Sequence, residues 1–161
     1  MRSATRASRA PAITRLATGE FFSTLLGWES MPSLMMFLSD TMFALAAVMH
    51  GCFLVLEMFF WEAPLGLRVF GQSPERAAAT ALLAKNQGLY NGFLAAGIAW
   101  GLAEGHSSYG MRVRLFFGAC VVVAGVYGAI STGKRAILVA QALPALIAVF
   151  ALLFAPSYRA P

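Results

Sequence analysis

Glu57 is the residue of this chain whose position is hardest to explain without a function. It lies in an apolar run, Met35 to Trp61, in which Asp40 and His50 are the other ionisable residues. A carboxylate in hydrocarbon is costly unless it is paired, protonated or turned to a polar cavity, so it marks a candidate functional site. Two helical turns separate His50 from Glu57, so in a helix both project from one face. A carboxyl and an imidazole placed in this way can hold or move a proton.

The elements that would position these groups follow from composition. Hydrophobic residues make up 59% of the 161 residues and charged residues 12%, which is too little polar surface for a soluble protein. A spanning helix needs about 20 mostly apolar residues. Four windows qualify: Met35 to Trp61, Leu82 to Leu102, Val113 to Ser131, and Ala136 to Phe154. The sequence therefore predicts an all-α fold, a four-helix transmembrane bundle whose neighbours in sequence are antiparallel neighbours in space.

The two chain ends lie outside the predicted four-helix domain, residues 35–155. Residues 1–34 carry four arginines among Ala, Ser and Thr, and contain no apolar core of the length that a secretory signal needs. They are either a disordered basic extension or the product of a start assigned too early, since Met31 stands just before the first span. Residues 156–161 are a short tail.

The connection after the first span carries two local signals. Pro64 and Gly66 predict that the first helix is broken there. Ser73 and Pro74, followed by an acidic residue, predict the start of the second helix, with Ser73 as N-cap and Pro74 at the first helical position. The second helix thus begins before its apolar part.

Polar residues from all four windows gather at one end of the predicted bundle. We call the end that holds loop 62–72 and turn 132–134 side A, and the opposite end side B. Helical rise places Glu57 roughly 6 Å inside an aromatic belt at Trp61. The sequence thus predicts a polar cluster in one leaflet and, within it, a ligand pocket whose candidate residues are Glu57, His50, Trp61, Asn86, Gln87, Tyr90, Asn91, Tyr127, Arg135 and Gln141.

Each candidate residue also has a purely structural explanation. Asn, Gln and Tyr side chains in membrane bundles often hydrogen bond between helices with no ligand involved. Glu57 can form an ion pair with Arg135 or hold a buried proton, and His50 can donate to a backbone carbonyl. Asp40 on side B is interpreted as an interfacial or capping group near the start of the first helix.

Metal and cofactor chemistry have no support in the residue spacing. Cys52 and Cys120 each lie in an apolar run without metal-ligand or redox spacing, so we interpret both as small buried apolar residues. We expect no metal and no cofactor. Nucleic-acid binding is also not expected, because the net charge of +5 comes from few basic residues, mostly at the predicted membrane edges.

Five segments carry a resemblance to a known family. They are Leu56 to Trp61, Arg68 to Gly71, Asn86 to Gly92, Ala124 to Gly128, and Gln141 to Ala145. In this order and spacing they resemble the signature blocks of a family of small bacterial membrane proteins known as domain of unknown function 1304. The likeness covers about Met36 to Phe154. It implies four transmembrane helices and no established activity.

Three classes of function stay open on the sequence. The first is a binding or transport module for a small amphiphilic or proton-coupled ligand. The second is a membrane enzyme with Glu57 as acid or base, similar in architecture to the membrane-associated eicosanoid and glutathione metabolism enzymes. That similarity is weakened by Lys85, Asn86 and Gln87, which stand where that family has an Arg, Asn and Glu set. The third is a structural or assembly protein. The expected partners are the lipid bilayer, a small ligand and further copies of the chain.

Basic residues set the expected orientation. Side A holds five of them, and side B holds three, or seven if the N-terminal arginines count. The orientation that the positive-inside rule gives therefore depends on the true start of the chain. We expect a multi-pass protein of the bacterial inner membrane with loops 62–72 and 132–134 in the cytoplasm.

Overall fold

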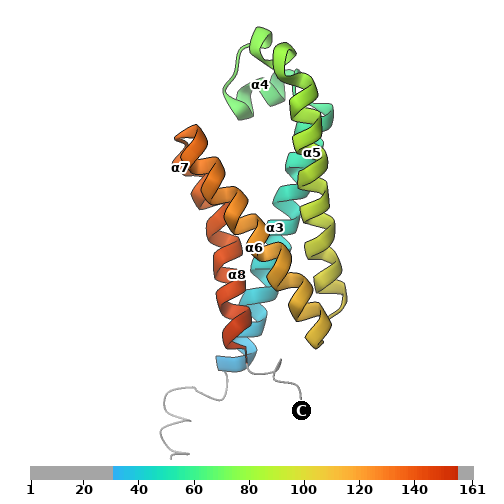
Figure 1. The fold of residues 1–161 in the computed structure, drawn as a ribbon, viewed down its shortest axis with the longest axis vertical. Helices are drawn as coiled ribbons and strands as arrows, with labels where there is room; N and C mark the ends of the chain where they lie inside the picture. The colour runs from blue at the N-terminus through green and yellow to red at the C-terminus, as the bar shows by residue number, and fades with distance from the viewer. Residues whose placement is uncertain (1–30, 156–161) are drawn as a thin grey trace, which may run out of the picture.

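The protein is a set of helices joined by short connections. A computed structural model describes residues 31–155, in which there is no strand. In chain order the helices are α3 (Met31–Phe59), α4 (Pro64–Phe70), α5 (Pro74–Ala103), α6 (Ser108–Thr132), α7 (Arg135–Ile137), the π-helical segment η1 (Leu138–Ala142) and α8 (Leu143–Phe154) (Figure 1). The predicted all-α fold is confirmed. Residues 1–30 of the predicted N-terminal extension and the predicted tail 156–161 lie outside the described residues, and α3 begins four residues before the predicted domain.

Within residues 31–155, three stretches of helix are long and apolar enough to cross a bilayer. They are α3, α6, and the continuous helical stretch Arg135–Phe154 that contains α7, η1 and α8. They coincide with three of the four windows predicted from the sequence, and by length and composition they mark the chain as a membrane protein. α5 is 30 residues long but does not meet the same apolar criterion, so its place as a fourth span stays a prediction.

The four long helices pack in a ring. α3 packs against α5 and α8, and α6 packs against α5 and α8. The core lies where all four meet, and is built from Phe43 and Ala46 of α3, Ile98 of α5, Val121 of α6, and alanines of α8 that include Ala148. Small residues on α8 let the helix backbones approach closely, which is the usual way for helices to pack in a membrane.

The ring is closed at side B and open at side A. The last buried residue of α3 is His50 and the last of α6 is Gly125, so neither helix buries a side chain over its final two turns. Figure 1 shows the same asymmetry: α6 and α7 lean away from α3 and α5 towards the end that carries α4. We call α3, α4 and α5 the first arm, and α6, α7, η1 and α8 the second arm.

Local signals at the start of α5 behave as the sequence predicts. The Ser73 hydroxyl accepts a hydrogen bond from the backbone N–H of Arg76 at 3.3 Å, and Pro74 is the first helical residue. Glu75 lies in the first turn, where hydrogen bonds from its own backbone N–H and from Ser73 lower the pKa of its carboxyl group. This cap fixes where α5 begins.

The predicted break after the first span holds a short helix instead of an irregular loop. Pro64 occupies the first position of α4, which a proline suits because its ring fixes φ and its missing N–H is not needed there. Gly66 is required by a close approach, since a Cβ there would lie 2.0 Å from the carbonyl oxygen of Phe60. The two residues that predict a break therefore start and fold α4 against the end of α3.

One expectation about the cysteines is wrong. Cys52 is exposed and Cys120 is only partly buried, so neither is a core residue. Cys52 falls on the outer surface of α3, where a small polarizable side chain is compatible with lipid.

Candidate functional site

Three of the predicted site residues form one hydrogen-bonded chain between α3 and α5. The Asn91 amide lies between the other two, with its Nδ2 donating to Glu57 Oε2 at 2.7 Å. Its Oδ1 lies 2.7 Å from His50 Nδ1. We call His50, Asn91 and Glu57 the Glu57 cluster. Its members are separated by 41 and 34 residues of sequence and meet only because α5 returns along α3.

Glycines on α5 bring the two helices close enough for this contact. A Cβ at Gly88 would lie 2.8 Å from Met58 Cγ, 3.1 Å from Glu57 Cβ and 3.2 Å from the Leu54 carbonyl oxygen. A Cβ at Gly92 would meet the Leu54 side chain at 3.1 Å. The two glycines flank Asn91, so their lack of side chains sets the short distance over which its amide reaches α3.

The Glu57 cluster links the protonation of Glu57 to the tautomer of His50. An ionised carboxylate only accepts hydrogen bonds, so Asn91 must then donate through its amide nitrogen. Its oxygen faces His50, which must donate through Nδ1–H. If Glu57 takes up a proton, it can donate instead, and the Asn91 amide can turn over and donate to His50 Nδ1. An ionised Glu57 thus requires hydrogen on His50 Nδ1, whereas a protonated Glu57 permits either tautomer.

Both ends of this chain are incomplete. His50 is 1% exposed, and its Nε2 is buried without a hydrogen-bond partner among the described residues. Glu57 is half-buried, and within residues 31–155 no cationic side chain lies within ion-pair distance of it. An ion pair between Glu57 and Arg135 is therefore not formed. A polar chain that is unfinished at both ends, at the depth of a membrane span, is typical of a binding or proton-handling site more than of a packing contact.

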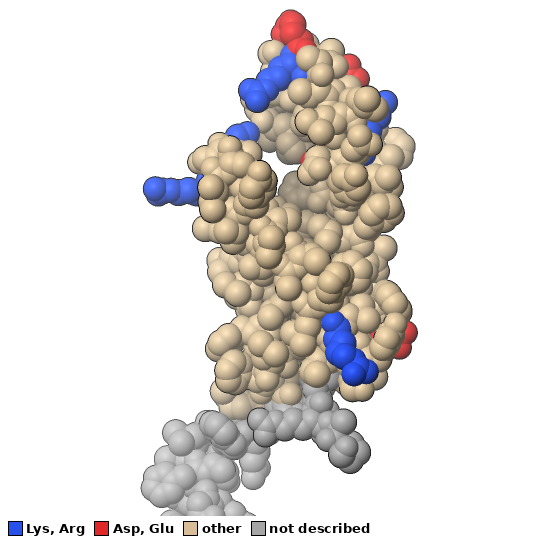
Figure 2. Space-filling view, viewed as in Figure 1, with Lys and Arg blue, Asp and Glu red and all other residues tan. Residues whose placement is uncertain are grey.

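A hollow lies between the two arms at side A, the end at which Glu57 stands on α3. Figure 2 shows this opening between the end that carries α4 and the end of the second arm, with basic side chains on both rims. Glu57 lies in the two turns of α3 where no residue is buried. One contact crosses the mouth: Lys134 Nζ in the turn before α7 donates to the Phe70 carbonyl oxygen at the end of α4, at 3.3 Å. The hollow is therefore open, and this hydrogen bond between described residues spans its mouth.

Trp61 has a packing role beside the site. Its indole N–H donates to the Ala77 carbonyl oxygen at 3.1 Å and approaches the Thr80 hydroxyl at 3.3 Å. Its ring packs against Phe70 with centroids 4.7 Å apart. These contacts join the ends of α3, α4 and α5 at side A and leave the indole N–H already satisfied.

The remaining candidates are not brought to Glu57 by any hydrogen bond within residues 31–155. Asn86 and Tyr90 each lie two residues from Gly88, about 200° around α5 from the face that packs on α3, and both are exposed. Gln87, Tyr127 and Arg135 are exposed as well, Tyr127 to 72%. Gln141 is partly buried in η1, on the second arm.

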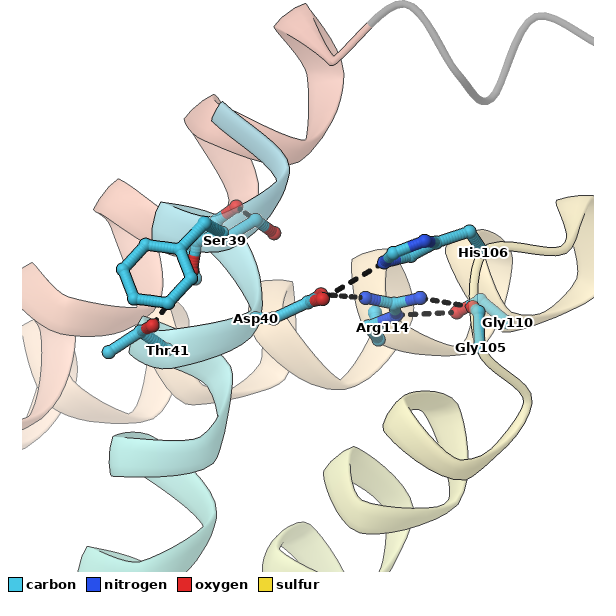
Figure 3. Close-up of polar contacts among 9 residues, drawn as sticks. Ser39, Asp40, Thr41, Gly105, His106, Gly110 and Arg114 are labelled. Atoms are coloured by element: carbon cyan, nitrogen blue, oxygen red, sulfur yellow. Dashed lines mark hydrogen bonds and ion pairs between the residues drawn. The ribbon is translucent and has the colours of Figure 1, made fainter. Parts of the chain in front are cut away.

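A second polar cluster, on side B, was not found from the sequence. Arg114 of α6 is 0% exposed, and its guanidinium donates to Asp40 Oδ1 on α3 and to the carbonyl oxygens of Gly105 and Gly110 (Figure 3). His106 Nε2 lies 2.9 Å from the other Asp40 carboxylate oxygen. We call Asp40, His106 and Arg114 the Arg114 cluster. The interpretation of Asp40 as only an interfacial or capping group is wrong, because it ties α3 to the α5–α6 connection and to α6.

A signal for this cluster was present in the sequence. Asp40 stands about one and a half turns into the first window and Arg114 stands at the start of the third, so antiparallel packing puts both near the same depth on side B. Opposite charges at one membrane depth tend to pair, because each offsets the desolvation cost of the other. The count of basic residues on side B includes Arg114 but was used only for membrane orientation, so it did not predict this pairing.

The sequence comparison gives the chain a family. A model described as a protein of unknown function, DUF1304, matches residues 44–153, which is most of the chain and covers all of both arms except the first 13 residues of α3 and the last residue of α8. The chain belongs to the DUF1304 family. No curated protein and no solved structure matches it. DUF1304 membership confirms the resemblance seen in the five sequence segments, and the matched range contains the whole Glu57 cluster but not Asp40.

Proposed function

We propose that this DUF1304 protein is a four-helix protein of the bacterial inner membrane that binds or transports a small amphiphilic ligand in the hollow between its arms. α5 is the fourth span in this proposal, because it runs along α3 and shares the core with the three apolar spans. Loops 62–72 and 132–134 face the cytoplasm, since five basic residues gather at that end.

The observation that carries the proposal is the Glu57 cluster itself. Glu57 and His50 are held 2.7 Å from either end of one Asn91 side chain, in helices that are otherwise apolar. A purely structural cluster would be expected to satisfy its groups, as the Arg114 cluster does. Here a carboxylate without a cation among the described residues lies in the last two turns of α3, at the end of the bundle where the arms separate.

Binding is favoured over catalysis by the position of the aromatic hydroxyls. An enzyme that used Glu57 as acid or base would need a second group to polarise a substrate oxygen. Tyr90 lies on the face of α5 away from α3, and Tyr127 is exposed on α6. Neither hydroxyl hydrogen bonds to a member of the Glu57 cluster. Proton coupling through Glu57, Asn91 and His50 needs no such group.

Native mass spectrometry of protein purified in mild detergent tests the proposal. Wild type is compared with Glu57→Gln, a neutral isostere, and with Glu62→Gln, which removes an exposed acid in the nearby connection. We expect a small molecule that stays bound to wild type and Glu62→Gln and is lost from Glu57→Gln, while all three unfold at similar temperatures. Equal spectra with no retained molecule, and equal stability, would make the cluster a packing device.

A further inference from the structure

The two carboxylates inside α3 differ in how their charge is compensated. Asp40 meets the Arg114 guanidinium on one oxygen and His106 on the other. Glu57 receives a neutral amide N–H on Oε2, and no hydrogen bond or ion pair to its other oxygen is formed within residues 31–155. A carboxylate at membrane depth with only a neutral partner is short of one positive charge. Either a proton or a cation from outside the described residues has to supply it.

The helices packed against this part of α3 offer no such cation. On α5, Lys85 is exposed and forms no ion pair with Glu57, and Tyr90 is turned away from α3. α8 has no titratable residue between Leu143 and Phe154. On α3 itself, His50 contacts the oxygen of Asn91 and not the carboxylate. No cationic side chain of α5 or α8 therefore neutralises the Glu57 carboxylate.

The hydrogen bond from Asn91 favours the ionised form of the Glu57 carboxylate. The amide nitrogen of Asn91 points at Glu57 as a donor, and its oxygen lies 2.7 Å from His50 Nδ1, which matches an Nδ1–H tautomer of His50. Hydrogen bonds to an ionised acceptor are stronger than those to a neutral one. The Glu57 cluster is thus arranged around a negative charge, with one oxygen held and the other left for a ligand.

The residues around Glu57 indicate what the uncharged part of the ligand must be like. The apolar side chains exposed at this end of the helices include Val55 and Phe59, which lie two residues either side of Glu57 on α3, and Ile130 in the last turns of α6. Basic side chains, including Lys134 and Arg135, lie at the rim, where water and lipid phosphates screen them. A charged group without apolar bulk would gain nothing from these walls, and entry from the bilayer avoids the basic rim.

We propose that the ligand of this site is a hydrophobic cation that competes with a proton for the Glu57 carboxylate. This inference rests on the proposed function and adds the class of ligand to it. When the cation binds to protein whose Glu57 is protonated, one proton leaves the carboxyl group as one positive charge arrives. The net charge of the site stays the same in both states, and the cation and the proton exclude one another, which is the condition for exchanging one for the other across a membrane.

The test uses tetraphenylphosphonium as the hydrophobic cation and tetraphenylborate as an anion of matched shape. Binding to the full chain in mild detergent is measured by equilibrium dialysis at several pH values, with proton release followed by calorimetry in two buffers. We expect the cation to bind more tightly as pH rises through the titration of Glu57, with up to one proton released per cation. Wild type alone gives this result, so it does not depend on how any variant folds.

Variants then assign the effect to one residue. Glu57→Gln should bind the cation roughly tenfold more weakly or worse, because a charged acceptor is lost. It should also abolish the pH dependence, whereas Glu57→Asp keeps both in part and Glu62→Gln matches wild type. Cation binding that is independent of pH, or unchanged in Glu57→Gln, overturns the inference. A Glu57-dependent ligand in native mass spectra that is neutral or anionic, or tighter binding of tetraphenylborate, would keep the proposed pocket and reject the cation.

Discussion

The two polar clusters of α3 lie on the same helix and differ in almost every physical respect. In the Arg114 cluster a fully buried guanidinium is surrounded by a carboxylate and two carbonyl oxygens, and the helices around it are packed. In the Glu57 cluster an amide joins a carboxylate to an imidazole whose far nitrogen has no partner in the described residues, and the arms separate. The charges of the Arg114 cluster are paired within the described residues, whereas the Glu57 cluster lacks a positive charge beside its carboxylate.

This difference separates stability from function along one helix. A buried pair that is fully hydrogen bonded resists the removal of either partner, because the other is left uncompensated. An incomplete cluster can lose a charge at little cost, since its charge was never neutralised. Mutations at side B should therefore affect folding, and mutations at side A should affect binding.

The largest effect is expected for Arg114→Leu. The substitution leaves Asp40 with a half-exposed histidine, and leaves two carbonyl oxygens without their donor. We expect the free energy of unfolding to fall by about 3 kcal/mol, the low end for breaking a buried pair because Asp40 is partly exposed. Thermal unfolding in detergent, followed by circular dichroism, measures it. Arg112→Leu is the control on the same helix, because Arg112 is exposed and its loss should change stability little. Equal losses in both variants would show that the cluster adds nothing.

The next largest effect is expected at the close contact that supports the Glu57 cluster. In Gly88→Val the new side chain would start within 3.2 Å of Met58, Glu57 and the Leu54 carbonyl oxygen. Overpacking of this kind costs roughly 2 kcal/mol, and the helices must separate to relieve it. Ligand retention in native mass spectra should fall together with the unfolding temperature.

Gly51→Val is the matched control for this contact. A Cβ at Gly51 meets nothing within 4 Å, and valine and glycine differ little in helix propensity, so stability should change by less than about 0.5 kcal/mol. A similar loss at both glycines would mean that the α3–α5 contact at Gly88 does not explain the Gly88 result.

The sequence predicts those parts of the fold that depend on local chemistry. The Ser73 cap, the Pro74 helix start and three of the apolar spans are each encoded within about 20 neighbouring residues. The short helix α4 was missed because Pro64 and Gly66 are equally compatible with a turn and with the start of a helix. Which of the two forms depends on the end of α3, against which Gly66 packs.

The candidate site was predictable in its position but not in its membership. Depth and spacing on α3 put Glu57 and His50 on one face, and the structure places both on Asn91. Depth and spacing could not predict which side of α5 faces α3, because Asn86, Tyr90 and Asn91 are all polar. That choice is made by Gly88, whose missing side chain admits α3 and turns Asn86 and Tyr90 outward. The Arg114 cluster depends on a contact over 74 residues, which no local pattern reports.

A smaller effect on stability, with a clear spectroscopic result, is expected for Asn91→Leu. The leucine removes the amide between Glu57 and His50, and stability should change by about 1 kcal/mol or less, as for a single hydrogen bond. The chain has two histidines, so His106→Asn leaves His50 as the only imidazole for nitrogen NMR. Nδ1 should carry hydrogen while Glu57 is ionised, and this preference should disappear in the Asn91→Leu variant. An unchanged spectrum would break the link between Glu57 and the His50 tautomer.

The smallest effect is expected inside the complete cluster, at its exposed edge. His106 contacts the same carboxylate as Arg114, at 2.9 Å, but its side chain is 45% exposed and that of Arg114 is 1% exposed. Exposed pairs contribute about 0.2–1 kcal/mol, because water already solvates both charges. His106→Asn should therefore lower the free energy of unfolding by less than about 1 kcal/mol, and added salt should reduce the difference. A loss as large as that of Arg114→Leu would mean that the imidazole, not the guanidinium, closes the bundle at side B. The contrast between a completed and an unfinished cluster would then rest on a group that water can reach.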